Sequence, residues 1–169
     1  LDNPVHDIEF RGITFEHSTW LTPSEEGIVG GQANQDMTYG VFKDNNVGVR
    51  REGTGIPIRN AQNIRFDGNT IRFMGATGIL VDSGTEGVVL INNTVDETAG
   101  NGIELGKFVV DENTDYHQVY VPEDERELCK NNRILNNVVH AVGTQYDGAV
   151  GIAAGYVQGI TIANNTIYD

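Results

Sequence analysis

The chain has 169 residues and a mass of 18.4 kDa, enough to bury the core of one domain but not of two. Its 24 acidic and 11 basic side chains give a formal net charge of −13, which would repel nucleic-acid phosphates, so we expect no nucleic-acid partner. No apolar run approaches the roughly 20 residues that cross a bilayer, and the single cysteine, Cys129, excludes an internal disulfide. Because the chain begins at Leu1 without an initiator methionine or an apolar leader, we expect a fragment whose targeting segment lies upstream.

An alternating apolar pattern that ends in Asn or Gly recurs along the chain. It occupies residues 8–15, 42–47, 64–71, 88–95, 134–139 and 160–167. Six residues occupy the same place in this pattern: Ile13, Asn45, Asn69, Asn93, Asn137 and Asn165. Their successive spacings are 32, 24, 24, 44 and 28 residues. The pattern therefore indicates a repeat with a basic period of 24 residues, lengthened by insertions.

A second pattern, a glycine turn followed by Ile and a short strand, recurs out of phase with the first. It occupies residues 54–58, 77–81, 101–105 and 150–154. Two or more strands per repeat without helical periodicity predict an all-β parallel β-helix, a solenoid of about five to six coils. We expect one domain over residues 1–169, with loop insertions at about 20–40 and 107–130, and further coils on both sides of this chain.

The paired asparagines have a structural explanation in such a solenoid. An Asn at the same bend of successive coils can hydrogen-bond its neighbours in a ladder and tolerates left-handed backbone geometry. The alternating apolar residues are expected to point inward and stack from coil to coil. They are Ile64, Phe66, Ile71, Ile79, Val81, Val88, Leu90, Val95, Ile103 and Leu105.

Carboxylates on the outer face of the Gly-Ile strands are the main candidates for chemistry. Arg59 and Asp82 occupy equivalent positions on adjacent coils, so their backbones are expected to lie about 4.8 Å apart. Their side chains can then pair, and this pairing would keep Asp82 ionised. Glu104 lies one coil further and stacks between Leu80 and Ala153, whose apolar side chains would raise the pKa of its carboxyl. We therefore expect Glu104 to act as an acid and Asp82 as a base.

The spacing of these two carboxylates also bears on the reaction. Strand geometry places Glu104 and Asp82 about 8 Å apart on a diagonal, and a separation of about 6.5 to 9.5 Å suits an inverting glycosidase. The alternative for Asp82 is a surface ion pair with Arg59. Asp147 is a third catalytic candidate, for which the alternative is an aspartate in the turn before Gly148.

Aromatic rings could form a sugar-binding surface near these carboxylates. Trp20, Tyr116 and Tyr146 are candidates for stacking on sugar rings, together with Arg59 as a polar substrate contact. For Tyr116 the alternative is a small cluster that pins its loop. The acidic insertion at 107–130 follows the strand of Glu104 and would overhang it, either as a substrate-covering loop or as a solvated acidic loop. No cysteine or histidine spacing suggests a metal site, so we expect neither a metal nor a cofactor.

Four stretches carry a resemblance to a known family. They are VHDIEFRGITFEHSTW at 5–20, GGQA at 30–33, GNGIELG at 100–106 and GAVGIAAGY at 148–156. Together they resemble bacterial right-handed parallel β-helix repeat proteins, and more narrowly glycoside hydrolase family 141. The resemblance implies a right-handed helix and a secreted or periplasmic enzyme that acts on plant cell-wall polysaccharide, with α-L-fucosidase and xylanase activities in the family and aspartates as catalytic groups.

The sequence therefore supports a first hypothesis and two alternatives. The first is a fragment of a β-helix glycoside hydrolase that acts on a polysaccharide or oligosaccharide through a carboxylate pair. The second is a Ca²⁺-dependent polysaccharide lyase, which would need a carboxylate cluster and a basic residue. The third is a non-catalytic carbohydrate-binding or structural β-helix, in which the outward carboxylates only keep the sheet soluble.

Overall fold

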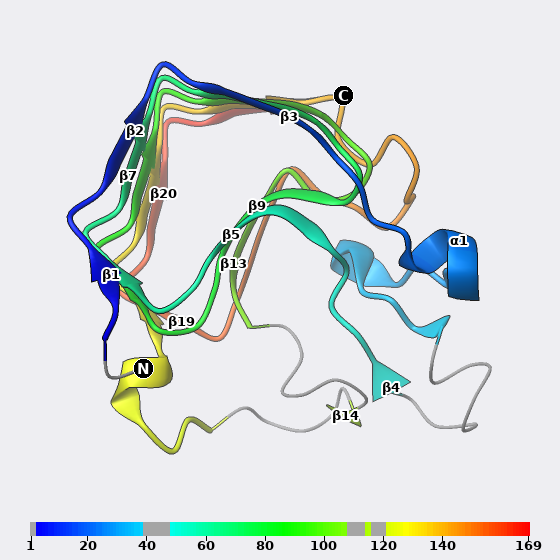
Figure 1. The fold of residues 1–169 in the computed structure, drawn as a ribbon, viewed down its shortest axis with the longest axis horizontal. Coiled ribbons are helices and arrows are strands. Elements are labelled where there is room, and N and C mark those ends of the chain that lie inside the picture. Colours follow the sequence, from blue (N-terminus) through cyan, green and yellow to red (C-terminus); the bar gives the residue numbers. More distant parts are fainter. Residues whose placement is uncertain (1–2, 39–47, 108–113, 116–120) are drawn as a thin grey trace.

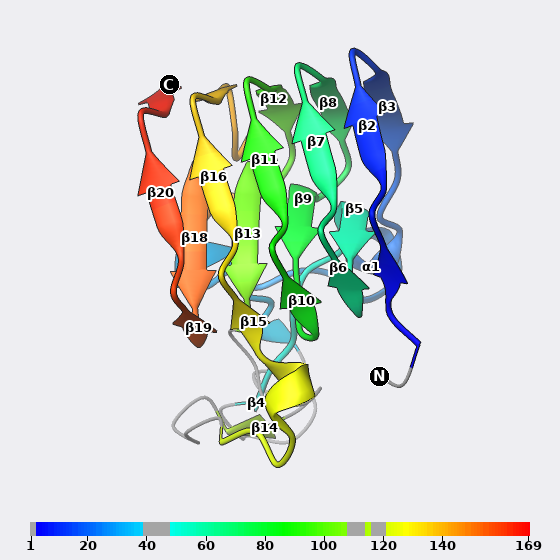
Figure 2. The same ribbon diagram turned by 90° about the vertical axis from the view of Figure 1, so that its left-hand side faces the viewer.

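The computed structural model describes residues 3–38, 48–107, 114–115 and 121–169, and these form an all-β right-handed parallel β-helix. The fold predicted from the repeats is confirmed. The described strands stack in five coils along one axis, which Figure 1 views end-on and Figure 2 from the side. Described helical elements are short: α1 (Thr22–Glu26), η1 (Gln32–Asn34) and η3 (Glu125–Glu127).

Four parallel sheets form the sides of the solenoid. The first contains β1 (Val5–His6), β6 (Ala61–Gln62), β10 (Thr85–Glu86), β15 (Cys129–Lys130) and β19 (Val157–Gln158). The second contains β2 (Glu9–Arg11), β7 (Arg65–Asp67), β11 (Val89–Ile91), β16 (Arg133–Leu135) and β20 (Thr161–Ala163). The third contains β3 (Thr14–Ser18), β8 (Thr70–Met74), β12 (Thr94–Thr98), β17 (Val138–His140) and β21 (Thr166–Tyr168). The fourth contains β5 (Thr54–Ile58), β9 (Thr77–Val81), β13 (Ile103–Gly106) and β18 (Ile152–Gly155).

The two insertions leave the solenoid on either side of the fourth sheet. One joins β3 to β5 and the other joins β13 to β15. They meet in a small antiparallel pair between β4 (Gly48–Val49) and β14 (Thr114–Asp115). The described parts of both insertions therefore contact each other on the same side of the molecule.

The first two coils stack without an intervening coil. Strand β3 pairs directly with β8, and the peptide N–H of Ile13 donates to the Asn69 side chain at 2.9 Å. The predicted coil at 42–47, with Asn45 in the ladder, is therefore wrong, because adjacent paired strands leave no place for it. Residues 42–47 themselves lie outside the described residues. The segment belongs to the insertion between β3 and β5, and it resembled a repeat only through its apolar and Asn spacing.

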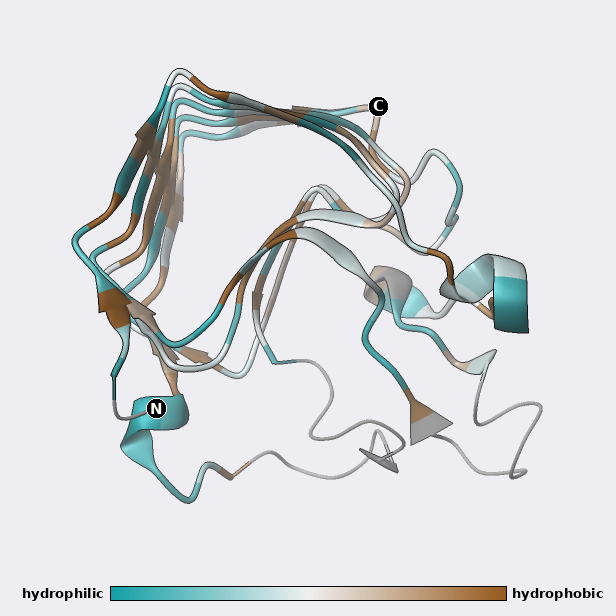
Figure 3. Ribbon diagram, viewed as in Figure 1, coloured by the Kyte–Doolittle hydropathy of each residue, from teal (hydrophilic) through white to brown (hydrophobic). Residues whose placement is uncertain are grey.

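The core is a column of aliphatic and aromatic side chains inside the coils. All ten residues predicted to point inward are buried in one hydrophobic cluster, so that prediction is confirmed. Phe10 stacks on Phe66 in the next coil with ring centroids 4.6 Å apart. Figure 3 shows hydrophobic colour along the strands and hydrophilic colour on α1.

A ladder of buried asparagines joins the coils at the corner between the second and third sheets. The Asn93 side-chain oxygen accepts from the Asn69 peptide N–H at 2.9 Å and from the Asn69 side-chain amide at 3.1 Å. The same two bonds recur from Asn93 to Asn137 and from Asn137 to Asn165. Each of these amides therefore links neighbouring coils, which confirms the predicted ladder.

The residue before each ladder position makes the bend itself. Its φ is positive in successive coils, at 64° for Gly12, 66° for Gly68, 58° for Asn92 and 53° for Asn136. Gly and Asn are the residues that enter this left-handed region at least cost. In each Asn pair the first residue therefore provides the turn and the second provides the hydrogen bonds.

We predict that Asn93→Ala lowers the free energy of unfolding by about 2 to 4 kcal/mol, because it removes the partner of the buried Asn69 backbone N–H and three further hydrogen bonds between buried groups. These three join Asn93 to the Asn69 side-chain amide, the Phe66 carbonyl oxygen and the Asn137 side-chain oxygen. Urea denaturation followed by circular dichroism measures the change.

The matched control is Asn92→Gly. Asn92 is exposed, and glycine keeps its left-handed backbone accessible while removing one surface hydrogen bond to Asp67. We expect a change below about 1 kcal/mol. Equal destabilisation by the two substitutions would contradict a special role for the buried ladder.

Candidate functional site

The outer face of the fourth sheet carries a buried polar cluster rather than an open surface. Leu80 lies between the core residues Ile79 and Val81, so its side chain points outward, yet it is 0% exposed. Asp82 is 6% exposed and Glu104 is 3% exposed. The outward position of Asp82 and Glu104 was predicted correctly from the sequence. Their burial was not predicted, because the insertion that covers them does not repeat and its course cannot be inferred from the coil pattern.

Arg51 lies across two strands of this sheet and joins the two predicted catalytic carboxylates. Its guanidinium is 2.8 Å from Asp82 Oδ2 and 3.5 Å from Glu104 Oε1, and it donates to the Gly106 carbonyl oxygen at 2.7 Å. Arg59 Nε lies 2.7 Å from Asp82 Oδ2, which confirms the predicted pairing. Asp82 therefore has two cationic partners, and one of them is shared with Glu104.

The pKa values of the two carboxyls are displaced in opposite directions. Burial by itself raises the pKa of Asp82, but the charge and hydrogen bonds of Arg51, the Ser83 peptide N–H and Arg59 together hold it below its usual value. Burial raises the pKa of Glu104, and the charge of Asp82 adds to this, while Arg51 opposes it without reversing it. Leu80 and Ala153 flank Glu104 in the adjacent strands, as expected.

Glu52 is a third buried carboxyl beside this pair. Its Oε1 accepts from the Thr77 hydroxyl and from the Asn101 peptide N–H at 3.3 Å, whereas its Oε2 is buried without a hydrogen-bond partner among the described residues. Burial raises the pKa of Glu52 to about 8, and the nearby charges of Glu104 and Asp36 contribute. Glu52 therefore holds a proton at neutral pH.

The first insertion is anchored over this cluster by its own buried ion pair. Asp36 is 1% exposed and accepts two bonds from the Arg50 guanidinium, at 2.8 and 3.1 Å. Arg50 also pairs with Glu26 at 2.9 Å. The Asn101 side-chain amide donates to the Ala33 carbonyl oxygen at 2.8 Å. The ion pairs hold the insertion together, and the Asn101–Ala33 bond attaches it beside the strand that carries Glu104.

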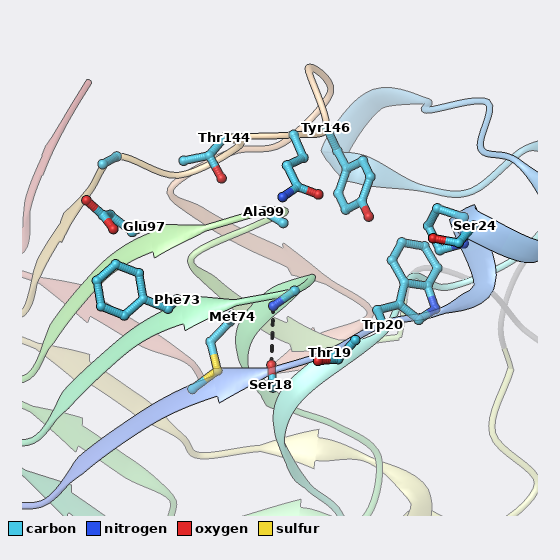
Figure 4. A pocket seen from close by; sticks show the side chains of 14 residues that line it. Ser18, Thr19, Trp20, Ser24, Phe73, Met74, Glu97, Ala99, Thr144 and Tyr146 are labelled. Atoms are coloured by element: carbon cyan, nitrogen blue, oxygen red, sulfur yellow. Dashed lines mark hydrogen bonds between the residues drawn. The ribbon is translucent and has the colours of Figure 1, made fainter.

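A groove of about 720 Å³ opens at the corner between the third and fourth sheets (Figure 4). The Trp20 and Tyr146 rings meet edge to face in its wall, with centroids 5.5 Å apart and planes at 80°. Burial raises the pKa of the Tyr146 hydroxyl, and the charge of Glu52 adds to this. A side chain at Gly53 would collide with the Trp20 ring, since a Cβ there would lie 2.7 Å from it.

The predicted site residues thus separate into groups. Asp82, Glu104 and Arg59 meet in one cluster, and Trp20 and Tyr146 meet in the adjoining groove. Asp147 is exposed, and no contact joins it to Asp82 or Glu104 within the described ranges. Tyr116 lies outside the described residues. The catalytic and substrate-binding roles assigned to all these residues stay predictions.

Sequence reasoning missed Arg51, Glu52, Thr77 and Asn101. A signal for two of them exists, because Thr77 and Asn101 immediately precede the glycine of the Gly-Ile repeat and so recur at one position of the turn. Arg51 and Glu52 precede β5, with Glu52 two residues before its first residue. No local sequence pattern indicates that the side chains of this pair reach over neighbouring coils.

Two negative findings apply to the described part of the chain. No cluster of three or more His, Cys, Asp or Glu side chains there is arranged to hold a metal ion. No helix there is both long and apolar enough to span a membrane.

The fold and this site define a class of protein. A family model described as "Right handed beta helix region" matches residues 3–114, and the chain belongs to that family. A solved structure named "Glycoside hydrolase" is similar over 99% of this chain, with 30% sequence identity and a TM-score of 0.89. The chain spans about 30% of the length of that protein. No curated protein matches the sequence.

We predict that Glu52 makes stability depend on pH above pH 5. Its folded pKa of about 8 exceeds the unfolded value of 4.5, so the folded state keeps a proton that the unfolded chain has lost. This contribution is complete below pH 4.5 and disappears as the pH rises through about 8, a loss of up to about 5 kcal/mol in the free energy of unfolding. Urea denaturation at pH 5, 7 and 9 measures the loss.

Glu52→Gln replaces the protonated carboxyl by a neutral group of the same shape, so its stability should vary less over this range. Glu86→Gln, which changes a half-exposed surface carboxyl, is the control and should keep the wild-type dependence. The same loss of stability in the wild-type protein and in Glu52→Gln would show that Glu52 is ionised in the folded protein.

Proposed function

We propose that this chain supplies part of the active site of a β-helix enzyme that hydrolyses glycosidic bonds in plant cell-wall polysaccharide. One observation carries the proposal. Glu104 and Asp82 share the Arg51 guanidinium, yet their pKa values move in opposite directions. An acid and a base of that kind are what glycoside hydrolysis needs.

The roles follow from these environments. Glu104, whose raised pKa favours the protonated form, gives its proton to the glycosidic oxygen as the bond to the anomeric carbon breaks. Asp82, kept ionised by Arg51 and Arg59, takes a proton from the water whose oxygen adds to that carbon. Asp147 is the alternative base. Because Glu104 and Asp82 are covered, the side chains above them have to move for a sugar to reach them.

The adjoining groove supports the same proposal. Trp20 is half-buried and offers ring surface of the kind on which sugars pack, with the buried Tyr146 ring packed edge to face against it. The similar solved structure is named a glycoside hydrolase. The substrate class that we propose is xylan or a fucosylated cell-wall glycan, for a xylanase or α-L-fucosidase activity. A secreted or periplasmic location belongs to the same proposal.

The test is release of reducing sugar from xylan and from fucosylated oligosaccharides by the full-length protein. We predict that Glu104→Gln and Asp82→Asn each lower kcat by about a hundredfold or more, since each removes one proton-transfer group. The surface variant Glu86→Gln should keep wild-type activity. Asp147→Asn decides between the two bases, because only the variant of the true base should lose activity.

Other outcomes separate the alternatives. Full activity of folded Glu104→Gln would falsify the assigned acid. An unsaturated product, lost when a chelator is added, would identify a Ca²⁺-dependent lyase instead. Binding of these glycans without turnover, unchanged when Asp82 and Glu104 are neutralised, would indicate a non-catalytic carbohydrate-binding solenoid.

A further inference from the structure

We propose that Glu52 restores the proton of Glu104 after each turnover, by way of the Thr77 hydroxyl that lies between them. The inference rests on the proposed function and deepens it, because it assigns a role to two residues that the hydrolysis step itself does not use. Glu52 and Thr77 act through Glu104 and need not touch the sugar. This relay can fail while hydrolysis stands, so the two proposals are tested separately.

Glu104 needs a proton donor within the protein because it is enclosed. It gives up a proton in each turnover and cannot act as an acid again until that proton is replaced. Only 3% of Glu104 is exposed, and Leu80, its partner in the neighbouring strand, is fully buried. Exchange of protons between Glu104 and bulk water is therefore restricted, and a buried donor beside it would speed the return.

One hydroxyl joins the two glutamates. The Thr77 side chain is fully buried and forms a hydrogen bond with Glu52 Oε1. A hydrogen bond from the same side chain lowers the pKa of Glu104. Thr77 is the first residue of β9 and Glu104 lies in the adjacent β13, so the register of the fourth sheet holds hydroxyl and carboxyl together. Glu52 reaches the same hydroxyl from the segment before β5.

A count of hydrogens indicates that this chain carries a carboxyl proton. A threonine hydroxyl has one hydrogen to donate, whereas two ionised carboxylates would each need one from it. Both bonds form together when one glutamate is protonated and donates to the Thr77 oxygen, which then donates to the other. The Asn101 peptide N–H is a further donor to Glu52, at 3.3 Å, but Glu52 Oε2 is buried without a partner among the described residues. Two ionised glutamates would therefore leave buried charge poorly compensated.

Glu52 is the member of the chain that stores the proton. Burial raises the pKa of Glu52 to about 8, and the charges of Glu104 and Asp36 add to this. Burial also raises the pKa of Glu104, but Arg51, at 3.5 Å, opposes the rise. Tyr146, a further titratable group that interacts with Glu52, has a raised pKa of its own and is neutral at the same pH.

The return step moves one proton along two hydrogen bonds. The O–H bond of Glu52 breaks as its proton moves to the Thr77 oxygen, and the O–H bond of Thr77 breaks as its hydrogen moves to the Glu104 carboxylate. Glu52 is left ionised and takes a proton from water. Asp82 releases to water the proton that it gained from the attacking water molecule. Protons therefore balance over one turnover, as hydrolysis requires.

The Glu52 end of the chain adjoins the open groove. The next residue, Gly53, packs so closely against the Trp20 ring that a Cβ there would lie 2.7 Å from it. Trp20 lines the groove at the corner of the third and fourth sheets. Groove water is thus the source of the proton that Glu52 takes up.

The first test is steady-state hydrolysis of the glycans by the full-length protein with Glu52→Gln. The amide is neutral and of the same shape as the protonated carboxyl, but it releases no proton. We expect kcat to fall about tenfold and KM to fall with it, so that kcat/KM changes little, because the first transfer from Glu104 is unaffected. Rapid mixing should show a first turnover at the wild-type rate and slower ones after it. The surface variant Glu86→Gln should keep the wild-type kcat.

The second test breaks the chain at its middle. Thr77→Val removes the hydroxyl and should lower kcat and KM in the same way, whereas Thr77→Ser restores a hydroxyl and should recover most of the loss. Thr98→Val is the matched control, because Thr98 is equally buried and its hydroxyl donates to the Gly100 carbonyl oxygen. An equal fall of kcat in Thr98→Val would attribute the effect to lost stability and overturn the role of Thr77.

Infrared titration of the unliganded protein measures the stored proton without turnover. We expect the C=O stretch of a protonated carboxyl at pH 7, part of which disappears with a midpoint of about 8 and is missing in Glu52→Gln. Absence of that part, or wild-type kcat and KM in Glu52→Gln, would overturn the relay. Loss of activity in Glu104→Gln beside such a result would leave the proposed function standing. Failure to cleave any glycan would refute both proposals.

Discussion

The solenoid depends on one constraint: each coil must place a side-chain amide oxygen against the peptide N–H of the coil before it. Asn93, Asn137 and Asn165 meet this requirement at the corner between the second and third sheets. A strand that slipped by one residue would turn its apolar side chains outward and would also break the ladder, so two independent penalties hold the same register. The positions of all outward-facing side chains follow from that register.

The candidate site is a product of stacking at fixed register and of one crossing side chain. Equivalent positions of neighbouring strands bring Asp82 beside Arg59 and set Glu104 in the next strand. Arg51 then reaches over both strands from outside the repeat. Burial without a cation leaves Glu52 protonated, whereas burial with two cations leaves Asp82 ionised. Buried carboxyls in one small region therefore have pKa values shifted in opposite directions. The difference comes from the positions of the arginines rather than from the degree of burial.

Repeating features could be predicted from the sequence, and single features could not. The core residues, the Asn ladder and the Arg59–Asp82 pair all follow from one strand geometry applied coil after coil. The path of an insertion does not repeat, so Arg51, Glu52 and Asp36 gave no periodic signal, and residues 42–47 gave a false one. The left-handed backbone at Phe73 and Glu97, with φ values of 52° and 48°, was also missed, because neither residue type favours that conformation. Its position is set by the corner of the coil rather than by the residue.

The unequal steps of the ladder have a consequence for how such a protein can change. Successive coils pair identically whether 24, 28, 44 or 56 residues separate their equivalent positions. The two longest steps contain the insertions between β3 and β5 and between β13 and β15, which precede and follow strands of the fourth sheet. The register of the coils is therefore the same across connections of different length. Because the segment between Ser18 and Thr54 also carries Arg51 and Glu52, exchanging it would alter the groove wall and the carboxyl cluster together.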